Sequence, residues 1–147
     1  MKIIAKNKKA LFDYEIMEKM EAGLALEGSE IKSIRDHNVN LKGSFVILRN
    51  MEAFVKGMHI SPYKFMSYNI DPERERKLLL KKREIEKIDR KIKEPGVTCV
   101  PLAIGISPRG FAKLEIALVK GKKQFDKRES LKRKTTDREM QRKIKSF

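Results

Sequence analysis

The side chains that could perform acid–base or metal chemistry are few and scattered. His37 and His59 have no cysteine or second histidine at the spacing of a metal site. His59 precedes Ser61 by two residues, which allows a base–nucleophile pair to be imagined, but a hydrogen-bonding or RNA-stacking histidine is the more common case. There is no glycine-rich phosphate loop and no nucleophile elbow. The sequence therefore predicts neither an enzyme nor a bound cofactor or metal.

Positive charge is the stronger chemical signal. The 147 residues include 35 Lys and Arg against 20 Asp and Glu, a net charge of +15. The 28 residues from Lys120 onward carry a net charge of +8, which is more than half of the excess in less than a fifth of the chain. Such a chain is expected to bind a polyanion, which is RNA, DNA or an acidic membrane surface.

The basic segment 121–147 holds too little apolar surface to offset the entropy of ordering it. We expect a disordered arm in the free protein; a solvated tail without a role is the alternative. Thr136 and Glu139 have the spacing of a capping box, and Met140, Ile144 and Phe147 follow as one apolar stripe. This pattern predicts a helix that forms only when a partner covers the stripe.

The rest of the chain has the length of one domain. No apolar run approaches the roughly 18 residues of a membrane span, and charges interrupt the N-terminal apolar residues, unlike in a signal peptide. Cys99 is the single cysteine, so an intramolecular disulfide is excluded and a reducing cytosol is expected. Its apolar surroundings in the sequence indicate a packing role.

The first third predicts two strands and a short helix. Residues 2–9 are read as a flexible basic leader, and residues 11–18 and 22–27 alternate as strands. Ser29 is the expected N-cap of the helix, with Ile31 and Ile34 inward. The side chains expected to face outward are Glu30, Lys32, Ser33 and Arg35.

The remainder predicts four strands and a long helix. Residues 44–49 and 53–60 predict a hairpin around Asn50. Asp71 and Pro72 begin a long helix whose apolar stripe is Leu78, Ile85, Ile88 and Ile92. Strand 97–106 contains Pro101, which indicates an edge or a bulge, and a turn at 107–110 leads into the alternating segment 111–119. Six strands and two helices favour a mainly β domain over residues 1–120, a small closed six-stranded barrel.

Five segments carry a resemblance. They are GSEIKSIR at 28–35, NLKGSF at 40–45, MHISPY at 58–63, DPERERKLLLKKREI at 71–85 and GKKQFDKRE at 121–129. In this order they closely resemble the small protein B (SmpB) family, the SsrA-binding proteins of bacteria. The resemblance implies an antiparallel barrel of the oligonucleotide-binding (OB) type.

The resemblance also implies a function in trans-translation, without enzymatic activity. The protein is expected in the cytoplasm, without contact to a membrane, bound to the D-loop and elbow of the transfer-RNA-like part of transfer-messenger RNA (tmRNA). It would replace the missing anticodon arm in the decoding site of a stalled ribosome, and its tail would become helical in the empty message channel. Elongation factor Tu and alanyl-tRNA synthetase are implied as indirect partners through the tmRNA.

Residues are assigned by matching the family motifs. The implied tmRNA-binding residues are Glu30, Lys32, Arg35, Asn40, Lys42, Gly121, Lys122 and Lys123. The implied decoding-site and channel residues of the tail are Asp126, Lys127, Arg128, Lys132, Arg133, Lys134, Arg138, Arg142 and Lys143. Met20 stands where the family usually has an aromatic residue, so base stacking is not expected there.

Glu30 is the unusual member of this set. A carboxylate at an RNA surface must accept a hydrogen bond from a base amine or sugar hydroxyl, or orient Lys32 or Arg35; the alternative is a surface helix with internal ion pairs. For the whole chain, two other functions stay open. One is a general RNA chaperone or ribosomal protein that binds by charge alone, and the other is an RNA-modifying or RNA-cleaving enzyme.

Overall fold

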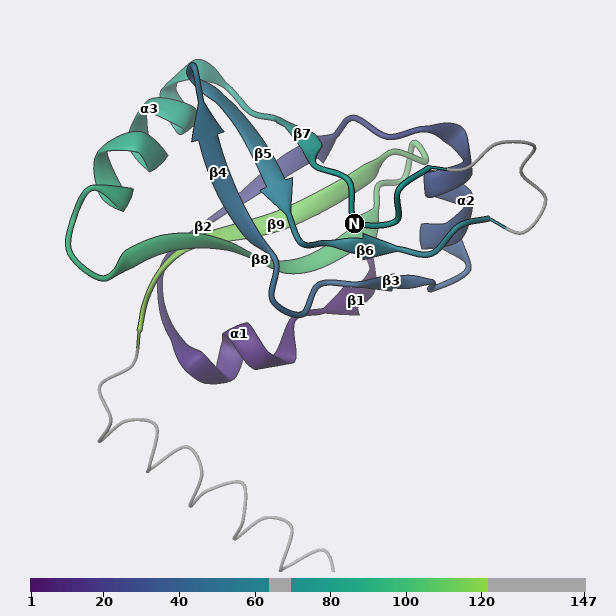
Figure 1. The fold of residues 1–147 in the computed structure, drawn as a ribbon, viewed down its shortest axis with the longest axis horizontal. Coiled ribbons are helices and arrows are strands. Elements are labelled where there is room, and N and C mark those ends of the chain that lie inside the picture. Colours follow the sequence, from purple (N-terminus) through teal and green to yellow (C-terminus); the bar gives the residue numbers. More distant parts are fainter. Residues whose placement is uncertain (64–69, 122–147) are drawn as a thin grey trace, which may run out of the picture.

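The computed structural model describes residues 1–63 and 70–121. Within these ranges the chain is mainly β, as predicted, with three helices (Figure 1). The helices are α1 (Lys8–Asp13), α2 (Gly28–Arg35) and α3 (Lys82–Ile92). The strands are β1 (Lys2–Lys6), β2 (Tyr14–Leu24), β3 (Val39–Asn40), β4 (Phe45–Arg49), β5 (Glu52–Lys56), β6 (His59–Ile60), β7 (Arg76–Leu79), β8 (Val97–Ile106) and β9 (Ala112–Gly121).

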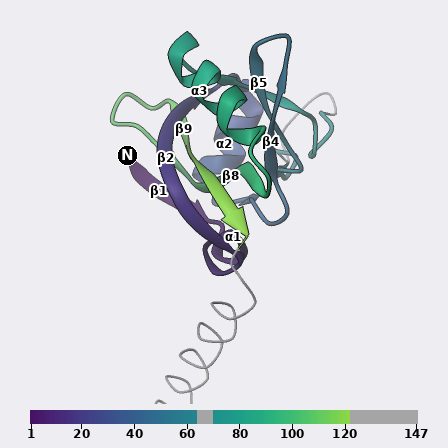
Figure 2. The same cartoon turned by 90° about the vertical axis from the view of Figure 1, so that its left-hand side faces the viewer.

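Seven of these strands form one antiparallel sheet in the order β1-β8-β9-β2-β7-β5-β4, and β3 pairs with β6 in a second, two-stranded sheet. The sheet curls around the core (Figure 2). Among the described residues neither sheet closes on itself, so the predicted closed six-stranded barrel is wrong in its strand count and its closure. Strand pairs as short as β3 and β6 carry too weak a period-2 pattern to be found in the sequence.

Strands β8 and β9 lie at the centre of the fold and are covered on both faces. Ala112, Leu114, Ile116 and Leu118 face the main core, as their alternation predicts. The opposite face is also buried, because Ala117 and Val119 pack with Ala10 of α1 in a second cluster. The sequence does not reveal this second cluster, since helix α1 was predicted to be part of a strand and a flexible leader.

The N-terminal prediction is wrong for residues 2–9, which are ordered. Residues 2–6 form β1, the edge strand that pairs with β8. Asn7 then caps α1, since its side-chain oxygen accepts a hydrogen bond from the amide of Ala10 at 3.2 Å. The two strands predicted at 11–18 and 22–27 are one continuous strand, β2, whose bulge lies between Ile16 and Glu18.

The long helix predicted from Asp71 is also wrong. The Asp71 side chain accepts the amide of Glu73 at 3.0 Å within a turn, and β7 follows. In β7 the even-numbered Arg76 and Leu78 are buried, while the two others are exposed. Helix α3 begins only after Lys81, whose amide is accepted by the Glu84 side chain at 2.9 Å.

Several local predictions are confirmed. Strands β4 and β5 form the hairpin, with Arg49 opposite Glu52, and Asn50 at φ 52°. The second strand ends at Lys56 rather than at residue 60, because Gly57 at φ 77° turns the chain toward β6. The register of β8 shifts between Pro101 and Ala103, which is the predicted bulge.

The last strand extends beyond its predicted end at residue 119. Strand β9 continues through Lys120 to Gly121, and Lys120 is opposite Glu15 of β2. The alternation of apolar residues stops before the hydrogen-bonded ladder does, which is why the predicted strand, 111–119, ends two residues too early. In residues 1–63 and 70–121, no helix is long and apolar enough to cross a membrane.

Candidate nucleic-acid interface

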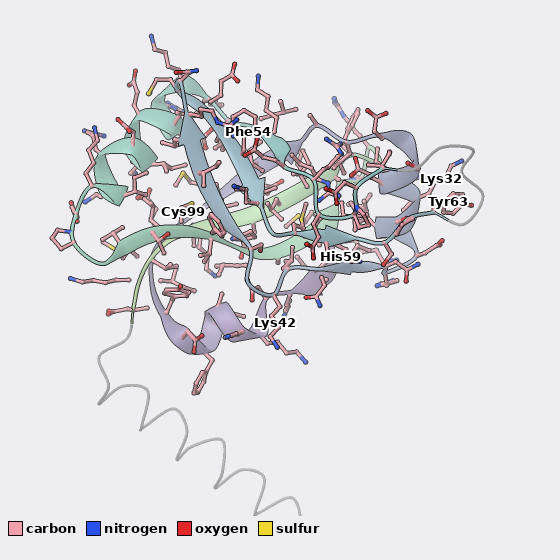
Figure 3. All side chains as sticks on the ribbon, in the orientation of Figure 1. Lys32, Lys42, Phe54, His59, Tyr63 and Cys99 are labelled. Carbon is pink, nitrogen blue, oxygen red and sulfur yellow. The ribbon has the colours of Figure 1, made fainter. Side chains whose placement is uncertain are left out.

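Helix α2 presents two of the predicted RNA-binding cations. Ile34 is fully buried, so the side chains of Lys32 and Arg35 are exposed on the outer side of the helix, as predicted. The ammonium of Lys32 lies 5.3 Å from the ring centroid of Tyr63, and the two side chains lie side by side in Figure 3. The ring limits the positions that the Lys32 side chain samples, and the ammonium stays accessible to a phosphate.

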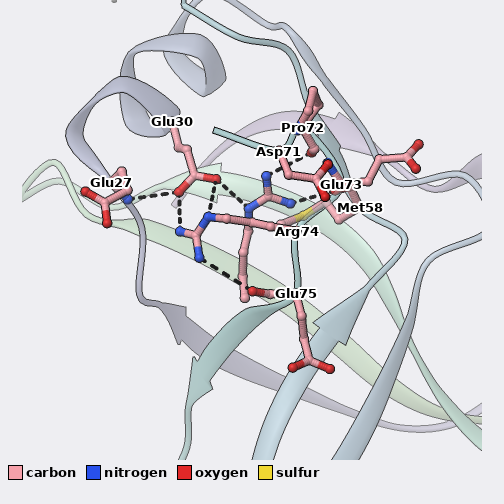
Figure 4. A network of polar contacts seen from close by, with 9 residues as sticks. Glu27, Glu30, Met58, Asp71, Pro72, Glu73, Arg74 and Glu75 are labelled. Carbon is pink, nitrogen blue, oxygen red and sulfur yellow. Dashed lines mark hydrogen bonds and ion pairs between the residues drawn. The ribbon is translucent and has the colours of Figure 1, made fainter. Parts of the chain in front are cut away.

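Glu30 and Ser33 do not face outward, contrary to the prediction. Glu30 is 4% exposed and Ser33 is 1% exposed. Burial of a carboxylate requires charged partners, and Glu30 has two, Arg74 and Arg76 (Figure 4). Both partners come from a segment that the sequence assigned to a helix, so the partnership could not be predicted.

The guanidinium of Arg76 is fully buried, and each of its three nitrogen atoms donates a hydrogen bond. It donates from Nε to Oε2 of Glu30 at 2.7 Å, from Nη1 to the carbonyl of Met58 at 2.7 Å and from Nη2 to the carbonyl of Pro72 at 2.9 Å. Arg74 binds both oxygens of the same carboxylate. Through Arg76, helix α2 is thereby fixed to the connection between β5 and β6 and to the turn before β7.

This network sets the charge states of its members. Burial alone would raise the pKa of the Glu30 carboxyl, but hydrogen bonds from Arg74, from the amide of Glu27 and from Arg76 outweigh it and hold the pKa below its ordinary value. Burial lowers the pKa of Arg76, and Glu30 opposes that change. An arginine remains charged in any case, so the cluster is one anion between two cations.

The start of α2 is also built by Glu30. The helix is preceded by Glu27, whose amide donates to Oε1 of Glu30 at 2.9 Å. Ser29 was the predicted N-cap, but it lies inside the helix and its buried hydroxyl has no partner within the described residues. The glutamate at the third helical position performs the capping, a role that a serine-centred prediction misses.

Lys42 lies in a loop after α2, as predicted, but Asn40 does not, because it is the last residue of β3 and pairs with His59 of β6. The side-chain oxygen of Asn40 accepts the amide of Lys42 at 2.9 Å. Leu41, between them, is 1% exposed and belongs to the main core, so the ammonium of Lys42 is directed outward. The Asn40 side chain thus shapes the loop that presents Lys42 (Figure 3).

Asn7 joins α1 to this loop. Its buried side-chain amide donates to the carbonyl of Leu41 at 3.3 Å and to that of Pro101 at 2.9 Å. Lys8 and Lys9 follow Asn7 at the start of α1 and are exposed, as is Lys42. The structure therefore brings together lysines that the sequence separates by more than 30 residues.

A cavity of about 370 Å³ opens beside these lysines. Its lining combines a cation, a carboxylate, two aromatic rings and hydroxyl groups, from α1 and its flanking residues, from the start of β4 and from β8: Asn7, Lys9, Ala10, Asp13, Tyr14, Gly43, Ser44, Phe45, Thr98 and Val100. Rings and cations of this kind can stack bases and hold phosphates. The sequence missed this cavity because its lining comes from three separate segments, 7–14, 43–45 and 98–100.

Gly121 lies at the edge of this region, because it is opposite Tyr14 in the ladder between β2 and β9. The predicted tail residues therefore begin next to α1. All of the other tail predictions lie outside the described residues: Lys122, Lys123, Asp126, Lys127, Arg128, Lys132, Arg133, Lys134, Arg138, Arg142 and Lys143. Helix α2 and helix α1 are on separate parts of the molecule in Figures 1 and 2, so the predicted set is not one compact cluster.

A metal centre is not formed in the part of the chain that the structure describes. No three His, Cys, Asp or Glu side chains are grouped there in a way that could hold a metal ion. His59 has Glu73 as its ion-pair partner, with 3.6 Å from Nδ1 to Oε1, and both side chains are well exposed. These are the features of a surface pair, and the remaining chemistry is that of exposed cations and rings.

Comparison with known proteins identifies the family. The family model described as SmpB protein matches residues 4–146. The chain is similar to the SsrA-binding protein of Enterococcus hirae, with 53% identity over 147 residues, 99% of this chain and 95% of the relative. The SsrA-binding protein of Pseudothermotoga lettingae is 51% identical over 148 residues, 100% of this chain and 97% of the relative.

A solved structure agrees with these matches. It is described as "tmRNA-SmpB: a journey to the center of the bacterial ribosome", and it is similar to this chain with a TM-score of 0.70 and 41% sequence identity. The similarity covers 86% of this chain and 93% of that chain. The resemblance found in the sequence motifs is confirmed, and the chain belongs to the SmpB family.

Proposed function

We propose that this protein binds tmRNA and delivers it to stalled ribosomes for trans-translation. The observation that carries the proposal is the similarity over nearly the whole chain to SsrA-binding proteins, at 53% identity for the Enterococcus hirae relative. The solved structure with a TM-score of 0.70 names tmRNA and the bacterial ribosome together with SmpB, which supports both partners. Elongation factor Tu and alanyl-tRNA synthetase would act on the same tmRNA.

The proposed tmRNA surface follows the exposed cations. Lys32 and Arg35 on α2 and Lys42 in the next loop would contact phosphates and sugars, and Asn40 would hold the loop. Gly121, Lys122 and Lys123 would extend this surface at the root of the tail. For Glu30 the buried network supports a positioning role, in which it anchors α2 instead of reaching RNA.

Residues 121–147 are proposed as a basic tail that becomes helical on the ribosome, separate from an OB-type domain over residues 1–120. Antiparallel strands with a flanking helix support the OB assignment. The tail residues from Asp126 to Lys143 would contact the decoding site and the message channel. The protein would act as an adaptor without enzymatic activity in the cytoplasm, where ribosomes translate.

The competing function is a general RNA chaperone that binds by charge alone. The two are separated by filter-binding competition between tmRNA and bulk transfer RNA at physiological salt. An adaptor should prefer tmRNA clearly, whereas nearly equal affinities would reject the proposal and favour the chaperone.

The same assay tests the surface. Arg35→Ala and Lys42→Ala should each weaken tmRNA binding and reduce the slope of log K against log salt by up to about 0.9, because each removes one phosphate contact. Lys93→Ala is the matched control, since this exposed lysine pairs with Asp89 on α3, away from the proposed surface. Unchanged affinity and slope for both variants would remove α2 and its loop from the interface.

A further inference from the structure

The turn between β8 and β9 exposes an aromatic ring. Phe111 follows this turn and is 63% exposed, more than any other large apolar side chain of the described residues. Its neighbours in the turn, Pro108 and Arg109, are also exposed. A single exposed ring with cationic neighbours is too small for a protein interface that depends on apolar burial.

The turn holds the ring in a defined place. The amide of Gly110 donates to the carbonyl of Ser107 at 2.8 Å, and the amide of Ser107 donates to the carbonyl of Phe111 at 2.8 Å. The hydroxyl of Ser107 accepts the amide of Phe111 at 3.2 Å. Pro108 restricts the backbone further. The ring is therefore presented by an ordered turn, which lowers the entropic cost of binding a partner.

The turn is joined to the proposed tmRNA surface through Arg35. Nη2 of Arg35 donates to the carbonyl of Gly110 at 3.4 Å. A Cβ atom at position 110 would lie 3.3 Å from this nitrogen, and φ is +88°, so a glycine permits the contact. Figure 1 shows the tip of the β8–β9 hairpin beside α2.

Positive charge dominates this corner, which consists of Lys2, Arg35, Arg109 and Phe111. Lys2 is opposite Ile106, directly before the turn. Within the described residues none of the three cations forms an ion pair, and together they outnumber Asp36, the acid that follows Arg35. Charge therefore favours an anionic partner, and the free ring favours one with a flat π-face.

We infer that Phe111 stacks on an unpaired nucleobase of tmRNA, while Arg35 and Arg109 hold the phosphates beside it. The inference rests on the proposed function and extends its surface from α2 to the β8–β9 turn. Transfer-messenger RNA is the chosen partner because Arg35 belongs to both the proposed surface and this corner. Stacking of the ring would add binding free energy to that of the phosphate contacts. This contribution depends little on salt, whereas the phosphate contacts depend on it strongly.

The test is filter binding of full-length variants to tmRNA across a salt series, after thermal melting has established that each variant is folded. Phe111→Leu keeps an apolar side chain without a π-face, and should weaken binding by about five- to a hundredfold with an unchanged salt slope. Phe111→Tyr keeps the ring and should bind within about twofold of the original chain. Met17→Ala is the control, since it removes a 45% exposed apolar chain in the distant half of β2.

The outcomes separate this inference from the proposed function. If Arg35→Ala and Lys42→Ala weaken binding but Phe111→Leu does not, the stacking contact is wrong and the proposed function stands. Equal losses for Phe111→Leu and Phe111→Tyr would also overturn stacking. Normal tmRNA binding by Phe111→Leu with weaker ribosome association would overturn it in favour of a ribosomal partner. Failure of the original chain to prefer tmRNA over transfer RNA would reject the proposed function itself.

Discussion

Nε of Arg76 lies 2.7 Å from Oε2 of Glu30, between a side chain that is 0% exposed and one that is 4% exposed. The pair connects β7 to the helix that carries Lys32 and Arg35. Buried ion pairs of this kind contribute little net stability compared with an apolar pair, but they are costly to break. Their effect is to fix one arrangement of α2 relative to the sheet.

Replacing Glu30 should therefore lower the free energy of unfolding of the protein. Glu30→Gln leaves Arg76 buried without its counter-charge and should cost about 3–5 kcal/mol. The measurement is the midpoint of urea unfolding, with an unchanged m-value. The control is Asp89→Asn, which removes the exposed partner of Lys93 and should cost at most about 0.5 kcal/mol. Equal midpoints for the two variants would contradict the role of the network.

The same pair should make stability depend on acid. Because the folded-state pKa of Glu30 is lower than its ordinary value of 4.5, its contribution is complete above that value and is lost as the pH falls through the folded-state pKa. Urea midpoints measured from about pH 6 down to about pH 2 should fall less steeply in Glu30→Gln than in the original chain. Parallel curves would show that Glu30 is not the responsible group.

Cys99 should be unreactive while the protein is folded. It is 1% exposed, and burial raises the pKa of its thiol to about 12. At about pH 8 the thiolate fraction is then on the order of one in ten thousand, so iodoacetamide should label the native protein very slowly. Rapid labelling is expected in concentrated guanidinium chloride. Labelling of the native chain at the rate of a free thiol would place Cys99 outside the core.

The apolar stripe predicted in the tail should contribute to peptide tagging separately from the net charge of the tail. Ile144→Asp should impair peptide tagging on stalled ribosomes, because it interrupts the stripe of Met140, Ile144 and Phe147. Ser146→Asp adds the same charge off the stripe and is the matched control. If both variants tag equally, the tail acts through its net charge and not as an amphipathic helix.

Long alternating segments could be predicted from the sequence. Strand β9 was predicted because its apolar residues alternate with polar ones, and the hairpin of β4 and β5 was predicted because two apolar segments flank Asn50. The positions of Lys32, Arg35 and Lys42 on the surface follow from the apolar residues beside them. These features depend on local sequence alone.

The remaining features depend on partners distant in the sequence. Arg76 occupies an inward position of β7, where Glu30, 46 residues earlier in the sequence, neutralises its charge. A charged residue at an inward position hides the alternation of a strand, so this segment was predicted to be helical. Likewise, α1 exposes its lysines and buries Ala10, while Asn7 bonds to Pro101 across 94 residues. A local pattern cannot show that a buried charge or amide is satisfied by a distant group.

Peptide tagging in a strain that lacks its own SmpB protein tests the central claim most directly. The strain receives either the full chain or a chain that ends after Arg128, and tmRNA binding is measured in parallel. We predict that the full chain restores tagging, whereas the shortened chain binds tmRNA almost as well but does not tag. Normal tagging by the shortened chain would contradict the role of residues 129–147. A full chain that neither prefers tmRNA nor restores tagging would contradict the account as a whole.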